Sequence, residues 1–260
     1  YQKGFNHGVN EAIALYLVAV NFPDLDKGGA WERTALSRLD YGLRDVIDED
    51  GVIVENSPYY HFYTLEKYYQ LYTYSQQQGI DIGDLLKNRL AQMARYATYI
   101  LQPNNELPLL GASLQRSVNY TGFYPGIAAF YPPLQFTLTN GEEGTQPEKL
   151  NVVFPQSGEV IMRSGWGNKK DYRKQTQVVF DAGAYRTDHS DLDALSFSLY
   201  GAGMALMPDS GLYTYTPGSY RDYFHGTESH NTVTVDGRDQ NAGAVSHGKL
   251  HEGNGYVSQA

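Results

Sequence analysis

The sequence contains no cysteine among its 260 residues. This absence excludes disulfide bonds, thiolate nucleophiles and cysteine-based metal sites, so histidine and carboxylate side chains are the groups left to ligate a metal. The chain also lacks a run of about 18 apolar residues, the length that a helix needs to span a bilayer. Its longest apolar stretch, around Ala12 to Val20, is predicted to be a buried helix, so no membrane span is expected.

Positive charge is scarce. Lysine and arginine number 20 against 29 aspartates and glutamates, which gives a net charge of −9. Without a basic stripe to neutralise phosphates, nucleic acid is not expected as a partner. A cleft on an acidic protein can still be locally basic, because the few charges that line it set its field. The candidates for such a lining are Arg116, Arg163, Arg186 and Arg221.

A start methionine and a charged-then-apolar leader are also missing, since the first residue is Tyr1. We therefore expect the sequence to be a fragment of a longer protein, with any signal peptide upstream of it.

Tyrosine, by contrast, is abundant. The chain has 23 tyrosines, and aromatic residues make up 13% of it. The flat apolar face and polar rim of tyrosine suit stacking on a pyranose ring. Tyrosine-rich β-sandwiches without any ligand also exist, so the excess fits a sugar-binding cleft and a plain sandwich equally well.

Helical spacing of apolar residues predicts four helices up to about residue 101. The first contains Ala12 to Ala19, the second Leu36 to Val46, the third runs from about Ser57 to Gln77, and the fourth from about Leu85 to Leu101. Ser57 is a good N-cap, and Pro58 after it suits a first helical turn. Residues 102–150 hold most of the prolines and are predicted to be an irregular linker with one more short helix.

After about residue 156 the pattern changes to short alternating runs separated by glycines. The predicted strands are Glu159 to Arg163, Gln175 to Phe180, Ala194 to Tyr200, Ala205 to Met207 and Thr232 to Val235. Regular turn signals between such strands favour an antiparallel sandwich over a parallel sheet with crossover helices.

Four segments concentrate side chains capable of acid–base or metal chemistry. They are Asn6-His7, residues 55–61, residues 188–197 and residues 220–237. Each has a structural interpretation that is about as good: a capping pair, an amphipathic aromatic helix, an exposed polar strand face and a polar turn. If the strand from Ala194 extends backwards, His189, Asp191 and Asp193 share one face. Such a group is not expected to be buried without partners or a metal.

Taken together, these segments resemble the heparinase II/III family and its alginate lyase relatives. The resemblance implies an α+β multidomain fold, in which a partial (α/α) helical toroid is followed by an antiparallel β-sandwich, with the active cleft between them. It covers the whole chain, with the early toroid helices missing. On this basis residues 1–150 are expected to be the C-terminal part of the toroid with its linker, and residues 151–260 a truncated sandwich.

The resemblance also assigns residues. Asn6-His7 resembles a motif on a toroid helix, and Glu55 to His61 matches a helix start that places the catalytic tyrosine at Tyr60. His189 takes the first position of a His-x-His-x-Asp-x-Leu-Ser-Phe pattern and is implied to be catalytic. The second histidine of that pattern is replaced by Asp191. With Asp209 and His230, the latter in His-Asn-Thr-Val-x-Val-Asp-Gly, it is implied to hold one structural divalent metal, zinc or calcium.

The implied activity is that of a polysaccharide lyase, which cleaves a uronic-acid-containing glycan by β-elimination and leaves an unsaturated uronate. Asn6 and His7 would polarise the uronate carboxyl group, and Tyr60 and His189 would share the base and acid roles, with no metal in the reaction. Arg116 or His61 would activate Tyr60. The substrate-binding residues expected from the sequence are Glu55, His61, Arg116, Tyr220, Arg221 and Tyr223. The expected partner is an acidic polysaccharide, and the expected location is the periplasm or the medium.

Two alternatives stay open. A glycoside hydrolase on a helical toroid needs two carboxylates across the scissile bond, for which the pair would be Glu55 and Asp188. A non-catalytic glycan-binding protein would bind without turnover. Within the lyase hypothesis, the scarcity of basic residues favours a non-sulfated uronate polymer such as alginate, hyaluronan or a bacterial exopolysaccharide.

Overall fold

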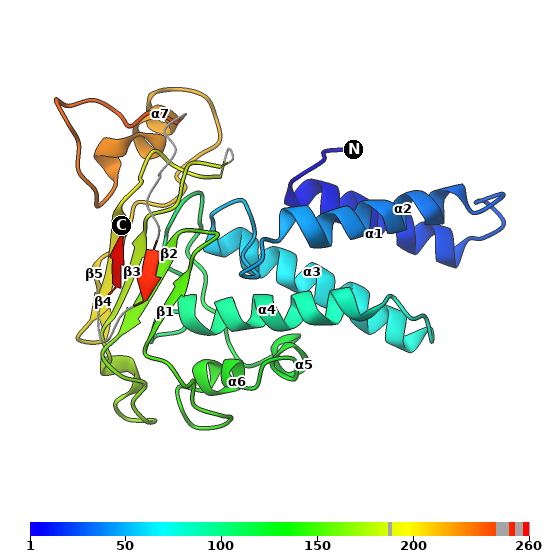
Figure 1. Ribbon diagram of the computed structural model, residues 1–260, viewed down its shortest axis with the longest axis horizontal. Helices are drawn as coiled ribbons and strands as arrows, with labels where there is room; N and C mark the ends of the chain where they lie inside the picture. Colours follow the sequence, from blue (N-terminus) through cyan, green and yellow to red (C-terminus); the bar gives the residue numbers. More distant parts are fainter. Residues whose placement is uncertain (187–188, 243–249, 253–256, 260) are drawn as a thin grey trace.

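A computed structural model describes residues 1–186, 189–242, 250–252 and 257–259. Helices come first and an antiparallel sheet follows, as predicted, and Figure 1 shows the helices extending away from one side of the sheet. The N-terminal part contains α1 (Asn6–Asn21), α2 (Ala30–Tyr41), α3 (Pro58–Gln77) and α4 (Asp84–Ile100). A π-helical turn, Gly42–Val46, continues α2, and two short helices, α5 (Tyr124–Ala128) and α6 (Pro133–Leu138), lie in the predicted linker, where one was expected. No described helix is long and apolar enough to cross a membrane.

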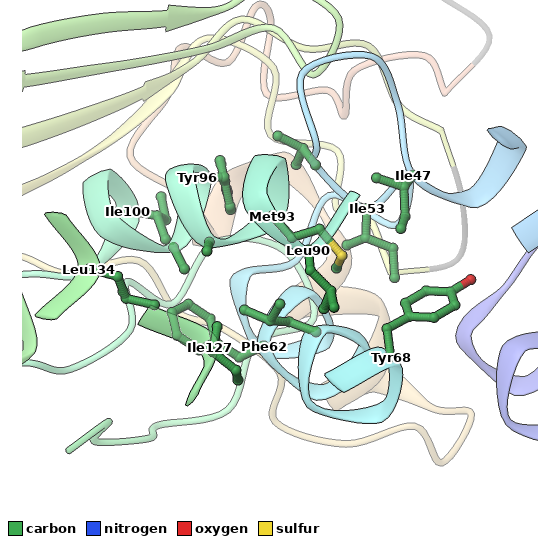
Figure 2. Packing of buried hydrophobic residues seen from close by; sticks show 14 of the residues in the cluster. Ile47, Ile53, Phe62, Tyr68, Leu90, Met93, Tyr96, Ile100, Ile127 and Leu134 are labelled. Atoms are coloured by element: carbon green, nitrogen blue, oxygen red, sulfur yellow. The ribbon is translucent and has the colours of Figure 1, made fainter. Parts of the chain in front are cut away.

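The helices form along apolar stripes of the sequence, and α3 also has a side-chain cap. Ser57 is the N-cap of α3, where its hydroxyl accepts a hydrogen bond from Tyr60 N at 3.5 Å, and Pro58 follows in the first turn. In α1 the buried side chains recur at helical spacing, including Val9, Ala12 and Tyr16. The α1 stripe packs against α2 and α3, and α3 packs on α4. Together the helices bury one core, part of which is drawn in Figure 2 with Phe62, Tyr68 and Leu90.

The sheet has five strands in the order β1-β2-β3-β4-β5, each antiparallel to its sequence neighbour. They are β1 (Asn151–Phe154), β2 (Glu159–Arg163), β3 (Gln177–Asp181), β4 (Ser196–Gly201) and β5 (Met204–Met207). Two further strands, β6 (Leu250–Glu252) and β7 (Val257–Gln259), pair with each other. Strand β1 was not predicted, although it supplies Val152 and Phe154 to the core.

Helices and sheet share that core. The Phe154 ring meets the Tyr96 ring of α4 edge to face, with centroids 5.1 Å apart. The Gln177 side chain of β3 donates hydrogen bonds to the carbonyls of Tyr99 and Leu101 at the end of α4. These hydrogen bonds satisfy carbonyl groups that have no donor within the helix, and they fix the end of α4 against the sheet.

The predicted strand from Thr232 to Val235 is wrong. Among the described residues, only a single bridge between Val235 and Arg238 forms there, around a turn with positive φ at Asp236 and Gly237. Val233 and Val235 are 75% and 70% exposed, so the alternation is present without the buried face that would make it a strand.

Candidate active site

Tyr60 is held at the start of α3, in the first turn after the Ser57 cap. Ser57 is itself fixed, because its hydroxyl lies 2.9 Å from the hydroxyl of Ser113 in the loop that follows α4. The predicted catalytic tyrosine therefore projects from a capped and buttressed helix end and not from a loop.

His189 lies against Tyr60. The two rings stack with centroids 3.9 Å apart and planes at 22°. The His189 carbonyl accepts a hydrogen bond from Ala112 N at 2.8 Å. Gly111 makes this approach possible, since it has a φ of +55° and a Cβ there would meet the His189 carbonyl oxygen at 2.7 Å.

A third aromatic residue, Tyr215, completes a hydrogen-bonded chain. Its hydroxyl lies 2.8 Å from the Tyr60 hydroxyl and 3.0 Å from His189 Nδ1, while His189 Nε2 lies 3.2 Å from Glu55 Oε2. Tyr215 was not predicted from the sequence, because it follows Gly211 in an irregular segment where no period or spacing marks it. The only available signal was its place in the tyrosine-rich stretch 213–223.

Glu55 connects the hydrogen-bonded residues Tyr60, Tyr215 and His189 to Asn6. The carboxylate is fully buried, and it accepts hydrogen bonds from the backbone N of Asn6 and, at 2.8 Å, from Asn6 Nδ2. Burial raises the pKa of Glu55, and the two Asn6 hydrogen bonds and the nearby His7 oppose that rise. Glu55 was expected to bind substrate. Its complete burial makes it a positioning residue for Asn6 and His189 instead.

The network also fixes where its protons sit. With Nε2 facing the Glu55 carboxylate, we assign the His189 proton to that nitrogen, which leaves Nδ1 to accept from Tyr215. Burial raises the pKa of Tyr60; the Tyr215 hydrogen bond opposes this rise and the Glu55 charge adds to it. Burial and the contact with Tyr60 also raise the pKa of Tyr215. Both phenols are thus neutral at neutral pH, and a base can be generated only by passing a proton along the chain.

The sequence matches models of one family over nearly its full length. Residues 1–136 match the heparinase II/III N-terminus, and residues 146–254 match the heparinase II/III-like C-terminal domain. The chain belongs to the heparinase II/III family.

Curated members of the heparinase II/III family are similar throughout the chain. A heparin-sulfate lyase of Pedobacter heparinus is 23% identical over 98% of this chain, and one of Bacteroides thetaiotaomicron is 27% identical over 90%. The chain spans 39% and 37% of those proteins. A crystal structure of heparinase III superposes with a TM-score of 0.80 at 23% identity, covering 97% of this chain and 42% of that one. That likeness confirms the predicted fold, a helical part followed by an antiparallel β part.

A second polar cluster of this heparinase II/III chain involves Asp191 and Asp193, a few residues after His189. Asp193, Asp209 and His230 each offer a ligand atom, and these atoms lie within 4.8 Å of one another. His230 Nδ1 is 2.7 Å from Asp209 Oδ1, and Asp191 Oδ2 is 4.0 Å from His230 Nε2. The predicted Asp209 and His230 are thus together, Asp191 lies beside them, and Asp193 is an addition.

The backbone that carries Asp191 and Asp193 does not have the expected strand conformation. Residues 189–195 form turns and not a strand, and Leu195 has a φ of +65° before β4 begins at Ser196. His189 and Asp191 therefore do not share a strand face, and they serve different clusters.

Two other predictions made from the sequence, for His61 and Arg163, are wrong. His61 is fully buried, with Nε2 3.0 Å from the Met93 carbonyl, and burial lowers its pKa to about 4, so it is a neutral core residue that meets no substrate. Arg163 is also buried, where it donates to the Leu101 carbonyl and lies over the Trp166 ring, so it does not line a cleft.

The remaining cations are placed differently. Arg116 pairs with Glu66 and also donates to the Tyr124 hydroxyl, so its charge is already matched away from the Tyr60 network. Arg186 lies 3.4 Å from Asp48. Arg221 alone of the four reaches the site, with its guanidinium 3.9 Å from Asp191 and 5.8 Å from the Tyr215 ring centroid.

Proposed function

We propose that this chain is part of a polysaccharide lyase that cleaves a uronic-acid-containing glycan by β-elimination. The observation that carries the proposal is the hydrogen-bonded series Tyr60–Tyr215–His189–Glu55. In it the two tyrosine hydroxyls are hydrogen-bonded to each other, and the His189 ring lies between Tyr215 and the Glu55 carboxylate. β-Elimination needs a base for the proton at C5, an acid for the departing O4 and an offset for the carboxylate charge. The division into residues 1–150 and 151–260 is part of the same proposal.

The network can supply both the base and the acid. His189 Nδ1 takes the Tyr215 proton while Tyr215 takes that of Tyr60, which turns Tyr60 into a phenolate that removes the C5 proton. Glu55 stabilises the imidazolium that forms, because its carboxylate faces Nε2. Tyr60, which now carries the C5 proton, gives it to O4 of the leaving sugar, and reversal of the relay then returns the His189 proton through Tyr215 to Tyr60. His7, which is exposed, and the buried Asn6 are the proposed partners of the uronate carboxyl group.

The hydrolase alternative fits this site less well. Its pair would be Glu55 and Asp188; Asp188 lies outside the described residues, and both oxygens of Glu55 are occupied by Asn6 and His189. A buried carboxylate with these partners has no access to a glycosidic oxygen. Only a measurement of turnover distinguishes the non-catalytic glycan-binding protein from the lyase.

The second cluster fits a structural divalent cation, zinc or calcium. His230 Nε2 and Asp209 Oδ2 are buried without a hydrogen-bond partner among the described residues, as is Asp191 Oδ2. Unpaired acceptor atoms on a histidine and two carboxylates are what a cation satisfies. We propose Asp193, Asp209 and His230 as ligands with Asp191 alongside. A cation there would neutralise the carboxylates and fix residues 189–195, and with them His189, without entering the reaction.

The substrate class is proposed as a uronic-acid glycan met in the periplasm or outside the cell. The acidic composition favours low sulfation, whereas the relatives are named for heparin sulfate. The test is incubation of the full-length protein with heparan sulfate, hyaluronan and alginate, read by the ultraviolet absorbance of the unsaturated uronate. We expect a rise on one polymer that is lost in His189→Ala. Reducing ends without that absorbance would favour the hydrolase, and binding without either product would favour the non-catalytic protein.

A further inference from the structure

Four aromatic side chains gather on and before α7 (Ser219–His225), the helix that lies above the sheet in Figure 1. The Tyr213 and Phe224 rings are stacked with centroids 5.0 Å apart and planes at 23°. Tyr220 lies 5.3 Å from Tyr213, and Tyr223 lies 5.2 Å from Phe224. We call Tyr213, Tyr220, Tyr223 and Phe224 the α7 platform.

The platform is not part of the core. Helix α7 buries none of its residues, and Tyr213, Tyr220 and Tyr223 are 60%, 65% and 49% exposed. A fully buried aromatic ring is stabilised by roughly 1.5 to 3 kcal/mol relative to an exposed one, so these rings leave most of that stabilisation unused. Exposed aromatic rings that gather in one place mark an interaction surface.

The platform is continuous with the Tyr60 network. Tyr213 is two residues before Tyr215, whose hydroxyl contacts both Tyr60 and His189. Arg221, next to Tyr220 on α7, places its guanidinium 5.8 Å from the Tyr215 ring centroid. A chain of sugar rings that extends from the Tyr60 hydroxyl past Tyr215 therefore has both a cation and an aromatic surface nearby, which suits an acidic glycan.

We propose that the α7 platform is a glycan-binding subsite, which stacks a pyranose ring of the same polysaccharide chain a short distance from the bond that is cleaved. The flat C–H face of a pyranose packs on an aromatic ring, and the phenol hydroxyls hydrogen-bond its edge. The inference rests on the proposed lyase function and deepens it, because a subsite of this kind makes the enzyme prefer long chains to short ones.

The test compares Phe224→Ala and Tyr213→Ala in the full-length protein with Phe22→Ala. Phe22 is 56% exposed and lies at the end of α1, at the far end of the helices from α7 in Figure 1, so it is a matched control. We expect the two platform variants to raise KM for the polymer about tenfold, the equivalent of about 1.4 kcal/mol, with kcat kept. KM for the shortest oligosaccharide that is cleaved should not change, and Phe224→Tyr should behave as the parent.

Equal KM values for parent and platform variants on the polymer would overturn the subsite. So would a platform variant that changes only the sedimentation behaviour, since the rings would then cover a second copy of the chain. Polysaccharide binding by calorimetry, with Tyr60→Phe as the background, separates this question from catalysis. Binding that Phe224→Ala weakens, together with no turnover by the parent protein on any polymer, would keep the subsite and reject the lyase; absence of binding to every uronate polymer would reject both.

Discussion

Two polar clusters meet at residues 189–193, and they are built in opposite ways. On the His189 side, the named atoms of Tyr60, Tyr215 and Glu55 have partners at hydrogen-bonding distance. On the other side, His230 and its aspartates keep acceptor atoms that are buried without one. A partnered network can move a proton because each site has a neighbour, whereas buried carboxylate oxygens without a hydrogen-bond partner favour a nearby positive charge. The same short segment therefore serves chemistry with one residue and cation binding with another.

Removal of one hydroxyl should break the first cluster. Tyr60→Phe keeps the ring that stacks on His189 and loses the oxygen 2.8 Å from Tyr215. We expect the rate of unsaturated product formation to fall by about 10²- to 10⁴-fold, with the fold unchanged. Tyr59→Phe, one position earlier in α3, is the control and should retain activity. Comparable losses in both variants would mean that Tyr60 acts through helix packing and not through its proton.

The second cluster should respond through stability. Asp209→Asn removes the charge that His230 faces at 2.7 Å, and breaking a buried pair costs about 3 to 5 kcal/mol of unfolding free energy. If a cation is bound, a chelator should destabilise the parent and leave the variant unchanged, and elemental analysis should find metal only in the parent. Asp171→Asn, a surface carboxylate paired with Lys174, is the control. A parent without metal and indifferent to the chelator contradicts the proposed cation.

Glu159 allows a further comparison with the two clusters. It is a buried carboxyl group that has no histidine partner among the described residues and is not among the proposed metal ligands. Its Oε2 lacks a partner among the described residues, and burial together with Asp181 on the neighbouring strand raises its pKa from 4.5 to about 8. The folded state therefore holds a proton between those pH values that the unfolded state releases, so its contribution to stability falls as pH rises through the window.

Glu159→Gln should consequently stabilise the protein at pH 8. The gain in unfolding free energy over the parent should be on the order of 2 to 4 kcal/mol there and should shrink towards pH 4.5. Denaturant unfolding at a series of pH values measures it, and Glu143→Gln at the surface is the control. A difference that does not vary with pH would show that Glu159 does not titrate in this window.

The smallest predicted effect is on stability and concerns the Ser57 cap, which holds Tyr60 in the first cluster. Ser57→Ala removes the cap that accepts from Tyr60 N and should lower the unfolding free energy by about 1 kcal/mol. A loss of activity larger than this destabilisation explains would indicate that the cap also aims Tyr60. Ser37→Ala, at an exposed position inside α2, is the control and should change stability by less than about 0.5 kcal/mol.

Local chemistry allowed a good part of the fold to be predicted. Ser57-Pro58 predicted the start of α3, and period-two alternation located β2 and most of β3 and β4. The same alternation failed at Thr232 to Val235, because a strand also needs a partner and a buried face, and neither is written in the strand's own residues. The strand face expected for residues 189–193 failed for the same reason.

The sequence by itself determined which residue types were available: no thiol, a capped helix start that carries Tyr60, and histidines and carboxylates in short motifs. Only the tertiary structure decided their roles. It removed His61 to the core, turned Glu55 into a buried partner of His189, and brought Tyr215 to Tyr60 across 155 positions of sequence. Spacing along a chain predicts neighbours within one helix or strand, whereas contacts between distant segments depend on how their surfaces pack, which a single sequence does not spell out.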